Sequence, residues 1–288
     1  MDTAELLKKV RKIEIKTRGL SSQVFSGEYH SAFKGRGMAF SEVREYTPGD
    51  DVRTIDWNVT ARFNSPYVKV FEEERELNVV LLVDVSASGQ FGTLKQSKKD
   101  LITELCAVVA FSASTNNDKI GVIFFSDKIE KYIPPKKGKT HILRIIRELV
   151  SIEPTSTKTD ISQALRYLTN VIKKKSIVFV VSDFIDNNPF VDAIKIANKK
   201  HDIVALEIFD KTEREIPPIG LIKLKDLESG EIKWVDTSSK AFQKEMKIQN
   251  FQLEARLKEG FNKAGVDHVR LRTDQSYIQP LMNLFKRR

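Results

Sequence analysis

The chain has 288 residues, of which 41% are hydrophobic and 30% are charged. Such a chain can bury a full core, which excludes an intrinsically disordered protein, and no apolar run reaches the roughly 18 residues of a membrane helix. The first residues, "MDTAELLKKVRK", are too polar for a secretion signal, so we expect a cytoplasmic protein with no membrane span. The single cysteine, Cys106, excludes an internal disulfide and a thiolate metal cluster.

The net charge of +9 raises the question of an acidic partner. A basic surface can attract nucleic acid, anionic lipid or an acidic protein. The lysines occur mostly in runs on helix faces, such as Lys173–Lys175, and no aromatic RNA-binding motif or zinc-finger spacing accompanies them. This pattern favours solvated faces, and nucleic-acid binding is kept only as an alternative.

Residues 1–75 differ from the rest of the chain. Asp2 and Glu5 form a capping box that predicts a first helix. The residues that follow are turn-rich and charged, with little periodicity. We therefore expect an irregular N-terminal extension or small subdomain over 1–75, placed before a larger domain over 76–288.

From residue 78 onward, apolar strand patterns alternate with amphipathic helix patterns. The expected strands are 78–84, 119–126, 176–184 and 202–209, and the expected helices are 93–114, 141–152, 160–172 and 188–200. Residues 127–135 are expected to return as a short antiparallel edge strand that Pro134 and Pro135 end. This order predicts a doubly wound, mostly parallel, Rossmann-like α/β sheet with helices on both faces.

The C-terminal part contains a predicted insertion. Residues 220–236 alternate in polarity around a Gly-containing turn, which predicts a β-hairpin. A long helix is expected at 239–263, ended by Gly265, because glycine suits the left-handed position after a helix. The strand "VDHVRLR" and a terminal helix at 275–286 complete the expected sheet.

Acidic and hydroxyl side chains follow the predicted strands. Asp84 ends one buried strand, and Ser86 and Ser88 lie on the loop after it. Asp183 ends the strand expected to lie beside it, and Thr159 stands at a helix start. Because ligands of open α/β sheets bind at the carboxyl ends of the strands, these side chains can meet at one rim.

The chemistry of this set favours a metal ion. Two neighbouring carboxylates repel each other unless a cation neutralises them, and the hydroxyl groups add uncharged oxygen ligands. An all-oxygen set suits Mg²⁺ or Mn²⁺, and it does not resemble the nitrogen and sulfur ligands of zinc. The simpler interpretation is that Asp84 and the two serines only cap a turn.

Other sites fit the pattern less well. A dinucleotide cradle needs a first glycine that "DVSASGQFG" lacks, and none of the four histidines has the context of a catalytic triad. An aspartyl-phosphate enzyme that uses Asp84 as its nucleophile stays open, although Ser86 stands where such enzymes usually have a second acid.

These residues resemble the von Willebrand factor A domain and its metal-ion-dependent adhesion site. Asp84, Ser86 and Ser88 match the D-x-S-x-S motif, and Thr159 and Asp183 match the later threonine and acid. The resemblance implies that these residues bind Mg²⁺ directly or through water and that a partner's carboxylate often completes the ligand set.

The preceding segment is similar to the domain-of-unknown-function 58 family. The matching residues are Tyr46, Pro48, Gly49, Asp50, Asp51, Arg53, Ile55, Asp56, Trp57, Ala61 and Arg62. Genes of this family commonly lie beside those of MoxR-type AAA+ ATPases, which implies a part in assembling protein complexes. Taken alone, the segment predicts a turn at Pro48–Gly49 and Trp57 as an anchor in a core. We expect Arg53 and Arg62 to pair with the nearby aspartates, and direct partner contact is the alternative.

Together these observations predict a non-enzymatic, Mg²⁺-dependent or Mn²⁺-dependent protein-binding module. Its partner would present an acidic residue, and a MoxR-type ATPase is one candidate. The enzymatic alternative is Mg²⁺-dependent phosphoryl transfer or hydrolysis through Asp84.

Overall fold

The computed structural model describes residues 8, 10–14, 16–17, 38–63, 65–73, 77–92, 96–186, 188–225 and 230–288. Residue contacts divide the chain into two compact units, one of residues 33–77 and one of residues 1–32 with 78–288. The predicted capping box of Asp2 and Glu5 lies outside the described residues. Within the described ranges, no helix is long and apolar enough to cross a bilayer.

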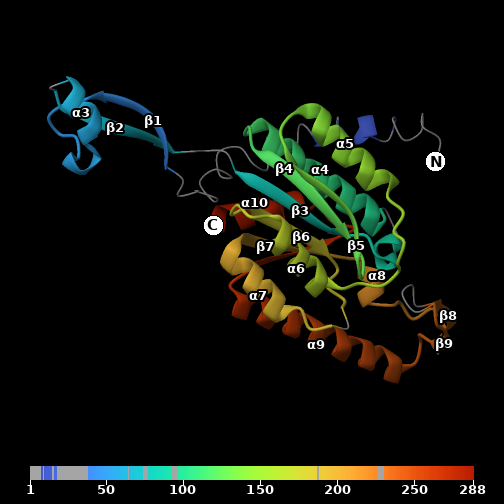
Figure 1. Cartoon of the computed structure of the whole chain (residues 1–288). Helices are drawn as coiled ribbons and strands as arrows, with labels where there is room; N and C mark the ends of the chain where they lie inside the picture. Colours follow the sequence, from blue (N-terminus) through green and yellow to red (C-terminus); the bar gives the residue numbers. More distant parts are fainter. Residues whose placement is uncertain are drawn as a thin grey trace. The chain divides into compact units, whose positions relative to one another are not determined.

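The larger unit is built on a six-stranded sheet with the order β10-β7-β6-β3-β4-β5 (Figure 1). All neighbouring strands are parallel except β5, which runs antiparallel to β4. The strands are β3 (Asn78–Asp84), β4 (Lys119–Phe125), β5 (Ile129–Lys136), β6 (Ile177–Ser182), β7 (Asp202–Phe209) and β10 (Asp267–Arg272). The predicted α/β class, a mostly parallel sheet flanked by helices, is confirmed.

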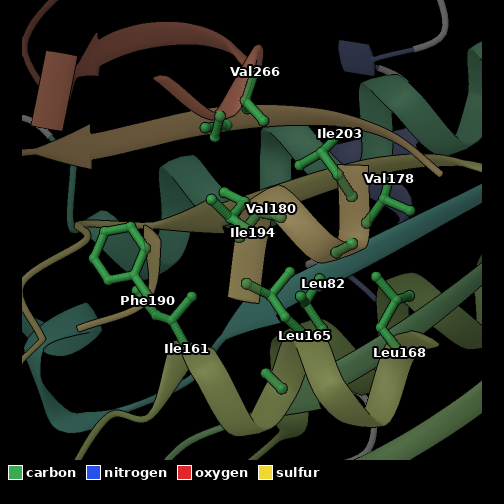
Figure 2. Close-up of a cluster of buried hydrophobic side chains, with 14 of the residues drawn as sticks. Leu82, Ile161, Leu165, Leu168, Val178, Val180, Phe190, Ile194, Ile203 and Val266 are labelled. Atoms are coloured by element: carbon green, nitrogen blue, oxygen red, sulfur yellow. The ribbon is translucent and has the colours of Figure 1, made fainter. Parts of the chain in front are cut away.

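The helices of this unit cover both faces of the sheet. They are α4 (Lys98–Thr115), α5 (Lys139–Ser151), α6 (Ile161–Val171), α7 (Val191–Lys200), α8 (Lys211–Arg214), α9 (Lys240–Ala264) and α10 (Ile278–Arg287). Side chains from α6, α7 and α9 pack with one face of β3, β6 and β7 in a buried cluster that includes Leu82, Leu165, Val180 and Ile194 (Figure 2). The central strands are apolar at nearly every position because helices cover both of their faces.

Helix α4 is buried along almost its whole length. Leu101, Leu105 and Val108 form part of the core, as their helical spacing predicts. Cys106 lies among them, and burial raises the pKa of its thiol. The cysteine is therefore a packing residue, as its sequence context indicates.

The edge strand β5 passes close to Gly121 of β4. The pairing register of the two strands shifts between Ile120 and Val122, and a Cβ atom on Gly121 would lie 2.8 Å from the carbonyl oxygen of Ile133. Glycine lets the two backbones approach at this irregular point.

Gly121→Ala is therefore expected to lower the free energy of unfolding by about 1–3 kcal/mol, as overpacking usually does. Urea denaturation followed by circular dichroism measures this change. Gly89→Ala is the matched control, because a Cβ atom there meets nothing within 4 Å and its cost should be small. Equal costs for the two variants would contradict the steric explanation.

A second, smaller sheet follows β7 in the chain. It is the hairpin of β8 (Leu221–Lys225) and β9 (Ile232–Asp236), which pair antiparallel as the alternating sequence predicts. Helix α9 then runs for 25 residues and ends at Gly265, whose φ of 64° is left-handed. A side chain at that position would be strained, which explains the glycine stop.

The smaller unit contains β1 (Met38–Glu45) and β2 (Tyr67–Glu73), paired antiparallel, and helix α3 (Trp57–Phe63). The described part of this segment thus has the regular elements of a small subdomain, the second of the two forms expected for residues 1–75. A shift in register between Phe40 and Glu42 interrupts the alternation of β1, so its period-two signal is weak in the sequence.

Candidate functional site

The acidic residues that follow β3 and β6 lie at the switch point of the sheet. Strand β3 pairs with β4 on one side and with β6 on the other, so the chain leaves β3 in one direction and later returns in the opposite direction. Asp84 is the last residue of β3, and Asp183 follows the last residue of β6. In open α/β sheets this position is where ligands bind.

Asp84 organises the first loop. Its Oδ1 accepts a hydrogen bond of 3.0 Å from the backbone N–H of Ser86, and its Oδ2 accepts one of 2.6 Å from the hydroxyl of Ser182. The hydroxyl oxygens of Ser86 and Ser88 lie 3.0 Å apart. The loop thus brings one carboxylate and two hydroxyl groups to the same end of β3.

The loop before α6 reaches the same rim. The backbone N–H of Ala87 donates to the carbonyl of Thr157 at 3.2 Å, which links this loop to the acid–serine loop. Thr159 is buried two residues further along. Asp160, the first residue of the helix expected over 160–172, is instead the N-cap of α6 and accepts from the N–H of Gln163 at 2.8 Å. Thr159 therefore lies just outside the helix.

Glu130 on β5 holds the same loop in place. Its carboxylate accepts hydrogen bonds from the hydroxyl of Thr155 at 2.8 Å and from the hydroxyl of Ser126 at 2.7 Å. Partial burial opposes ionisation of Glu130, but these hydrogen bonds outweigh it and lower the pKa of the carboxyl. The edge strand is thus part of the scaffold of the rim.

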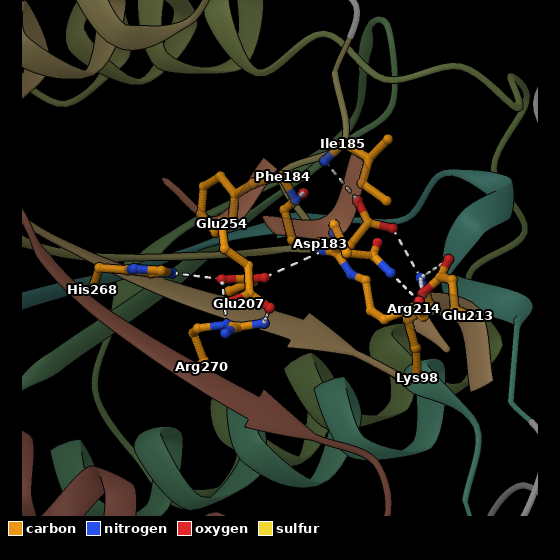
Figure 3. Close-up of polar contacts among 12 residues, drawn as sticks. Lys98, Asp183, Phe184, Ile185, Glu207, Glu213, Arg214, Glu254, His268 and Arg270 are labelled. Atoms are coloured by element: carbon orange, nitrogen blue, oxygen red, sulfur yellow. Dashed lines mark hydrogen bonds and ion pairs between the residues drawn. The ribbon is translucent and has the colours of Figure 1, made fainter. Parts of the chain in front are cut away.

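Asp183 is bound to a buried lysine. The Nζ atom of Lys98 lies 2.9 Å from Oδ2 of Asp183 and 2.8 Å from the carboxylate of Glu213 on α8 (Figure 3). Lys98 is only 1% exposed. It occupies the first position of α4, where the helix dipole disfavours a positive charge, so the two carboxylates account for its place there. Burial opposes the charged amine, but the two acids outweigh burial and raise the pKa of Lys98.

The residue after Asp183 has an unusual backbone. Phe184 is fully buried and has a left-handed φ of 55°. Its ring packs against Phe261, with ring centroids 5.0 Å apart, and its N–H donates to the hydroxyl of Ser182 at 3.0 Å. A left-handed aromatic residue costs on the order of 1–3 kcal/mol, so the core contacts hold the chain in the turn that places Asp183 at the rim.

The two acids of the site influence each other electrostatically. Burial raises the pKa of Asp84 to about 7, and the nearby charge of Asp183 adds to this shift. The hydrogen bonds from Ser182 and Ser86 oppose it only in part. Asp84 thus lies where a further positive charge would stabilise its ionised form.

Two groups near this rim were not recognised in the sequence. Asp186 accepts hydrogen bonds from the N–H of Ile161 at 2.9 Å and of Asn188 at 2.7 Å, so it joins the loop after β6 to the start of α6. Glu207 on β7 lies 2.8 Å from the ring Nε2 of His268 and 3.3 Å from Arg214 (Figure 3). Asp186 is a single acid in a loop and Glu207 is a single acid in an ordinary strand pattern, so no sequence motif marks them.

Helix α8 forms ion pairs with Lys98 on one side and with Glu207 on the other. Glu213 binds Lys98, and Arg214 binds Glu207, so neighbouring residues of one short helix connect the Asp183 side of the rim with the end of β7. The hairpin of β8 and β9 follows this helix directly. The rim and the base of the hairpin are therefore parts of one connected scaffold.

The motif of the smaller unit is organised differently from its prediction. Asp50 accepts two hydrogen bonds from Arg44, at 2.7 and 2.8 Å, and this guanidinium lowers the pKa of Asp50 well below its usual range. Asp56 lies 3.3 Å from Lys69 and caps α3 through the N–H of Asn58. Among the described residues, these aspartates thus pair with Arg44 and Lys69, and the predicted pairing with Arg53 and Arg62 is not formed.

Other residues of this motif are exposed or shape turns. Trp57 is 71% exposed, so its prediction as an anchor in a core is wrong. Gly49 has a φ of 112°, which explains a glycine in the predicted turn. Asp51 accepts from the N–H of Arg53, and the N–H of Tyr46 donates to the carbonyl of Pro66. Arg53 and Arg62 are exposed, and contact of either with a partner stays a prediction.

Comparison with known proteins identifies the family. The model of the family described as "Protein of unknown function DUF58" matches residues 42–256, which include both the motif of the smaller unit and the rim. The chain belongs to the DUF58 family.

Relatives and solved structures extend the comparison. The DUF58 chain is 27% identical over 288 residues to the uncharacterized protein Rv1480 of Mycobacterium tuberculosis, covering 99% of this chain and 86% of the relative. BatB from Bacteroides thetaiotaomicron is similar with a TM-score of 0.48 and 16% identity, over 73% of this chain and 98% of that one. A von Willebrand factor type A structure from Catenulispora acidiphila has a TM-score of 0.37 and 12% identity, over 50% and 35% of the chains.

The rim of this DUF58 chain fits a hard cation only if hydroxyl groups take part. In the part of the chain that the structure describes, no three His, Cys, Asp or Glu side chains form a group that could hold a metal. The hydroxyl groups of Ser86 and Ser88 are hydrogen-bonded to each other at 3.0 Å, and adjacent ligands of an octahedral Mg²⁺ would have a similar separation of about 3 Å. The buried Asp84 supplies a negative charge beside them. The donor set is thus compatible with Mg²⁺ or Mn²⁺.

Proposed function

We propose that this protein is a non-enzymatic, divalent-metal-dependent protein-binding module that acts in the cytoplasm, with a von Willebrand factor A-like domain over 76–288 and an extension over 1–75. The observation that carries the proposal is the pair of hydroxyl groups of Ser86 and Ser88, spaced like adjacent ligands next to the buried Asp84. The partner would present an Asp or Glu side chain to the rim.

The residues of the rim would have distinct parts in this function. Ser86, Ser88 and Thr159 would offer uncharged oxygen ligands, and Asp84 and Asp183 would supply the negative charge. A bound Mg²⁺ or Mn²⁺ would provide an open coordination position for the carboxylate of a partner. Because three of these five side chains are neutral, the ion would keep enough positive charge to attract that carboxylate.

Membership of the DUF58 family supports a search for one particular partner. The resemblance of the segment around Tyr46–Arg62 to this family implies an association with a MoxR-type AAA+ ATPase, so we propose such an ATPase as the first candidate. The net charge of +9 would favour the approach of an acidic surface.

Titration calorimetry with Mg²⁺ and with Mn²⁺ tests the metal-dependent function. The wild-type protein is expected to bind, and Ser86→Ala is expected to bind at least about tenfold more weakly, the loss that even an outer ligand partner causes. Ser239→Ala is the matched control, because Ser239 also precedes a helix but makes no side-chain capping hydrogen bond. Equal and negligible heats for the wild type and Ser86→Ala would end the proposal.

The enzymatic alternative makes a separate prediction. A phosphoryl-transfer enzyme would use Asp84 as its nucleophile, but both oxygens of this carboxylate already accept hydrogen bonds and the side chain is buried. This geometry favours a binding function over attack on phosphorus. Incubation with a phosphoryl donor separates the two functions, since phosphorylation that disappears in Asp84→Asn would favour the enzyme.

A further inference from the structure

The hairpin of β8 and β9 has one face that exposes apolar side chains. In its register, Leu221 pairs with Asp236, Lys223 with Trp234 and Lys225 with Ile232, and because side chains alternate along a strand, these six point to the same side. We call this side the hairpin face. Leu221 and Trp234 are each 66% exposed and Ile232 is 49% exposed. Three large apolar side chains on one small sheet form a patch of the kind that marks a binding surface.

The hairpin is firmly attached at its base. The hydroxyl and the N–H of Thr237, which is fully buried, donate to the carbonyl of Gly220 at 2.8 and 2.9 Å. The side-chain amide of Gln243 on α9 donates to the carbonyls of Ile216 and Thr237 at 2.8 and 2.9 Å. The base of the hairpin is therefore held in place by hydrogen bonds to the chain on either side of it.

The hairpin face carries two lysines, Lys223 and Lys225, and one acid, Asp236. Elsewhere on the described part of the hairpin, Lys233 pairs with Glu231 at 3.1 Å. Among the described residues, no ion pair is formed by Lys223 or Lys225, which alternate with the apolar side chains. Beyond Thr237, three further lysines of α9 line a shallow hollow of about 790 Å³ together with Ile248 and Phe251: Lys240, Lys244 and Lys247. Aromatic and aliphatic side chains interspersed with lysine suit a negatively charged, partly apolar partner.

The identity of the cationic side chains, lysine or arginine, indicates which class of partner the hairpin face binds. Protein–protein interfaces are enriched in arginine and depleted in lysine, because arginine forms directed pairs of hydrogen bonds with carboxylates. The cations of the hairpin face are both lysine. Lysine is a flexible point charge whose alkyl chain can lie along an apolar surface while its amine reaches a phosphate. This composition favours lipid headgroups over an acidic protein.

We propose that the hairpin face docks on an anionic lipid bilayer. Trp234, Leu221 and Ile232 enter the boundary between headgroups and acyl chains, and Lys223 and Lys225 contact lipid phosphates. The attachment is peripheral, through the hairpin, and it does not depend on the metal site. A single small face with two lysines gives weak and reversible binding, which falls as salt screens the charges.

Vesicle sedimentation tests this proposal with the full chain. Vesicles of phosphatidylcholine and phosphatidylglycerol in a 3:1 ratio are compared with vesicles of phosphatidylcholine alone, in the presence of EDTA. We expect binding only to the anionic vesicles. Lys223→Gln/Lys225→Gln should weaken it roughly 25-fold, at about fivefold for each lysine near the charged surface. The matched control is Lys173→Gln/Lys174→Gln, which removes two exposed lysines elsewhere and should bind within about twofold of the wild type.

Tryptophan fluorescence provides a second readout that leaves the hairpin intact. The chain has 2 tryptophans, so Trp57→Phe leaves Trp234 as the only one. Its emission should shift to the blue when anionic vesicles are added. An unchanged emission, equal binding to both kinds of vesicle, or equal losses in the two double-lysine variants would each overturn the proposal. Binding to poly-glutamate without binding to vesicles would also overturn it, in favour of an acidic polypeptide.

Discussion

Replacing Lys98 with methionine is expected to lower the free energy of unfolding by about 3–5 kcal/mol, the cost of removing one partner from a buried ion pair. The amine lies 2.9 Å from Asp183 and 2.8 Å from Glu213, and both its own side chain and that of Asp183 are almost fully buried. Methionine fills a similar volume, so most of the loss comes from carboxylates left without a cation. Urea denaturation at pH 7 measures the change.

Two variants separate this effect from a packing defect. Lys99→Met removes the neighbouring lysine, which donates to the carbonyl of Ile152 at 3.0 Å, and should cost only about 1 kcal/mol. Lys98→Met/Asp183→Asn removes one of the unpaired charges together with the amine and should recover part of the loss. If Lys98→Met cost no more than Lys99→Met, the buried cation would have no special role.

The sheet could be predicted from the sequence because its signals are long and local. Strands such as 78–84 are apolar at nearly every position, and helices such as α4 repeat their apolar residues at helical spacing. With the strand order that this alternation implies, the ends of β3 and β6 must lie at one rim. The positions of Asp84 and Asp183 at the ends of these strands are therefore enough to predict that the two acids lie close together.

The contacts that hold the rim could not be predicted, because they depend on side chains far apart in the chain. Lys98 and Glu213 are 115 residues apart, and in the sequence Lys98 is indistinguishable from the adjacent Lys99. The prediction that Trp57 is an anchor in a core is wrong for a related reason. A tryptophan in a short helix can face either a core or solvent, and the bounds of α3 alone do not decide between the two.

Asp84→Asn is expected to raise the stability of the metal-free protein at pH 8. Burial raises the pKa of Asp84 from its ordinary value of 3.8 to about 7, so between these values the folded protein keeps a proton that the unfolded chain has lost. Stability therefore falls as the pH rises through this window, and the full penalty, about 4 kcal/mol, is present above pH 7. Asparagine carries no charge and avoids this penalty. After a loss of about 1 kcal/mol for the altered hydrogen bond with Ser182, the expected gain is about 2–3 kcal/mol.

Divalent metal should reverse the order of stability of the wild type and Asp84→Asn. A cation beside Asp84 removes the reason for its raised pKa, so saturating Mg²⁺ should stabilise the wild type and leave Asp84→Asn almost unchanged. Thermal unfolding at pH 8 with EDTA and with Mg²⁺ measures both effects, and Asp160→Asn, which keeps a capping side chain on α6, should follow the wild type. A variant less stable than the wild type in EDTA would show that Asp84 stabilises the fold by itself. The combination of lower intrinsic stability and metal-dependent recovery is what a binding site, as opposed to a turn cap, requires of this carboxylate.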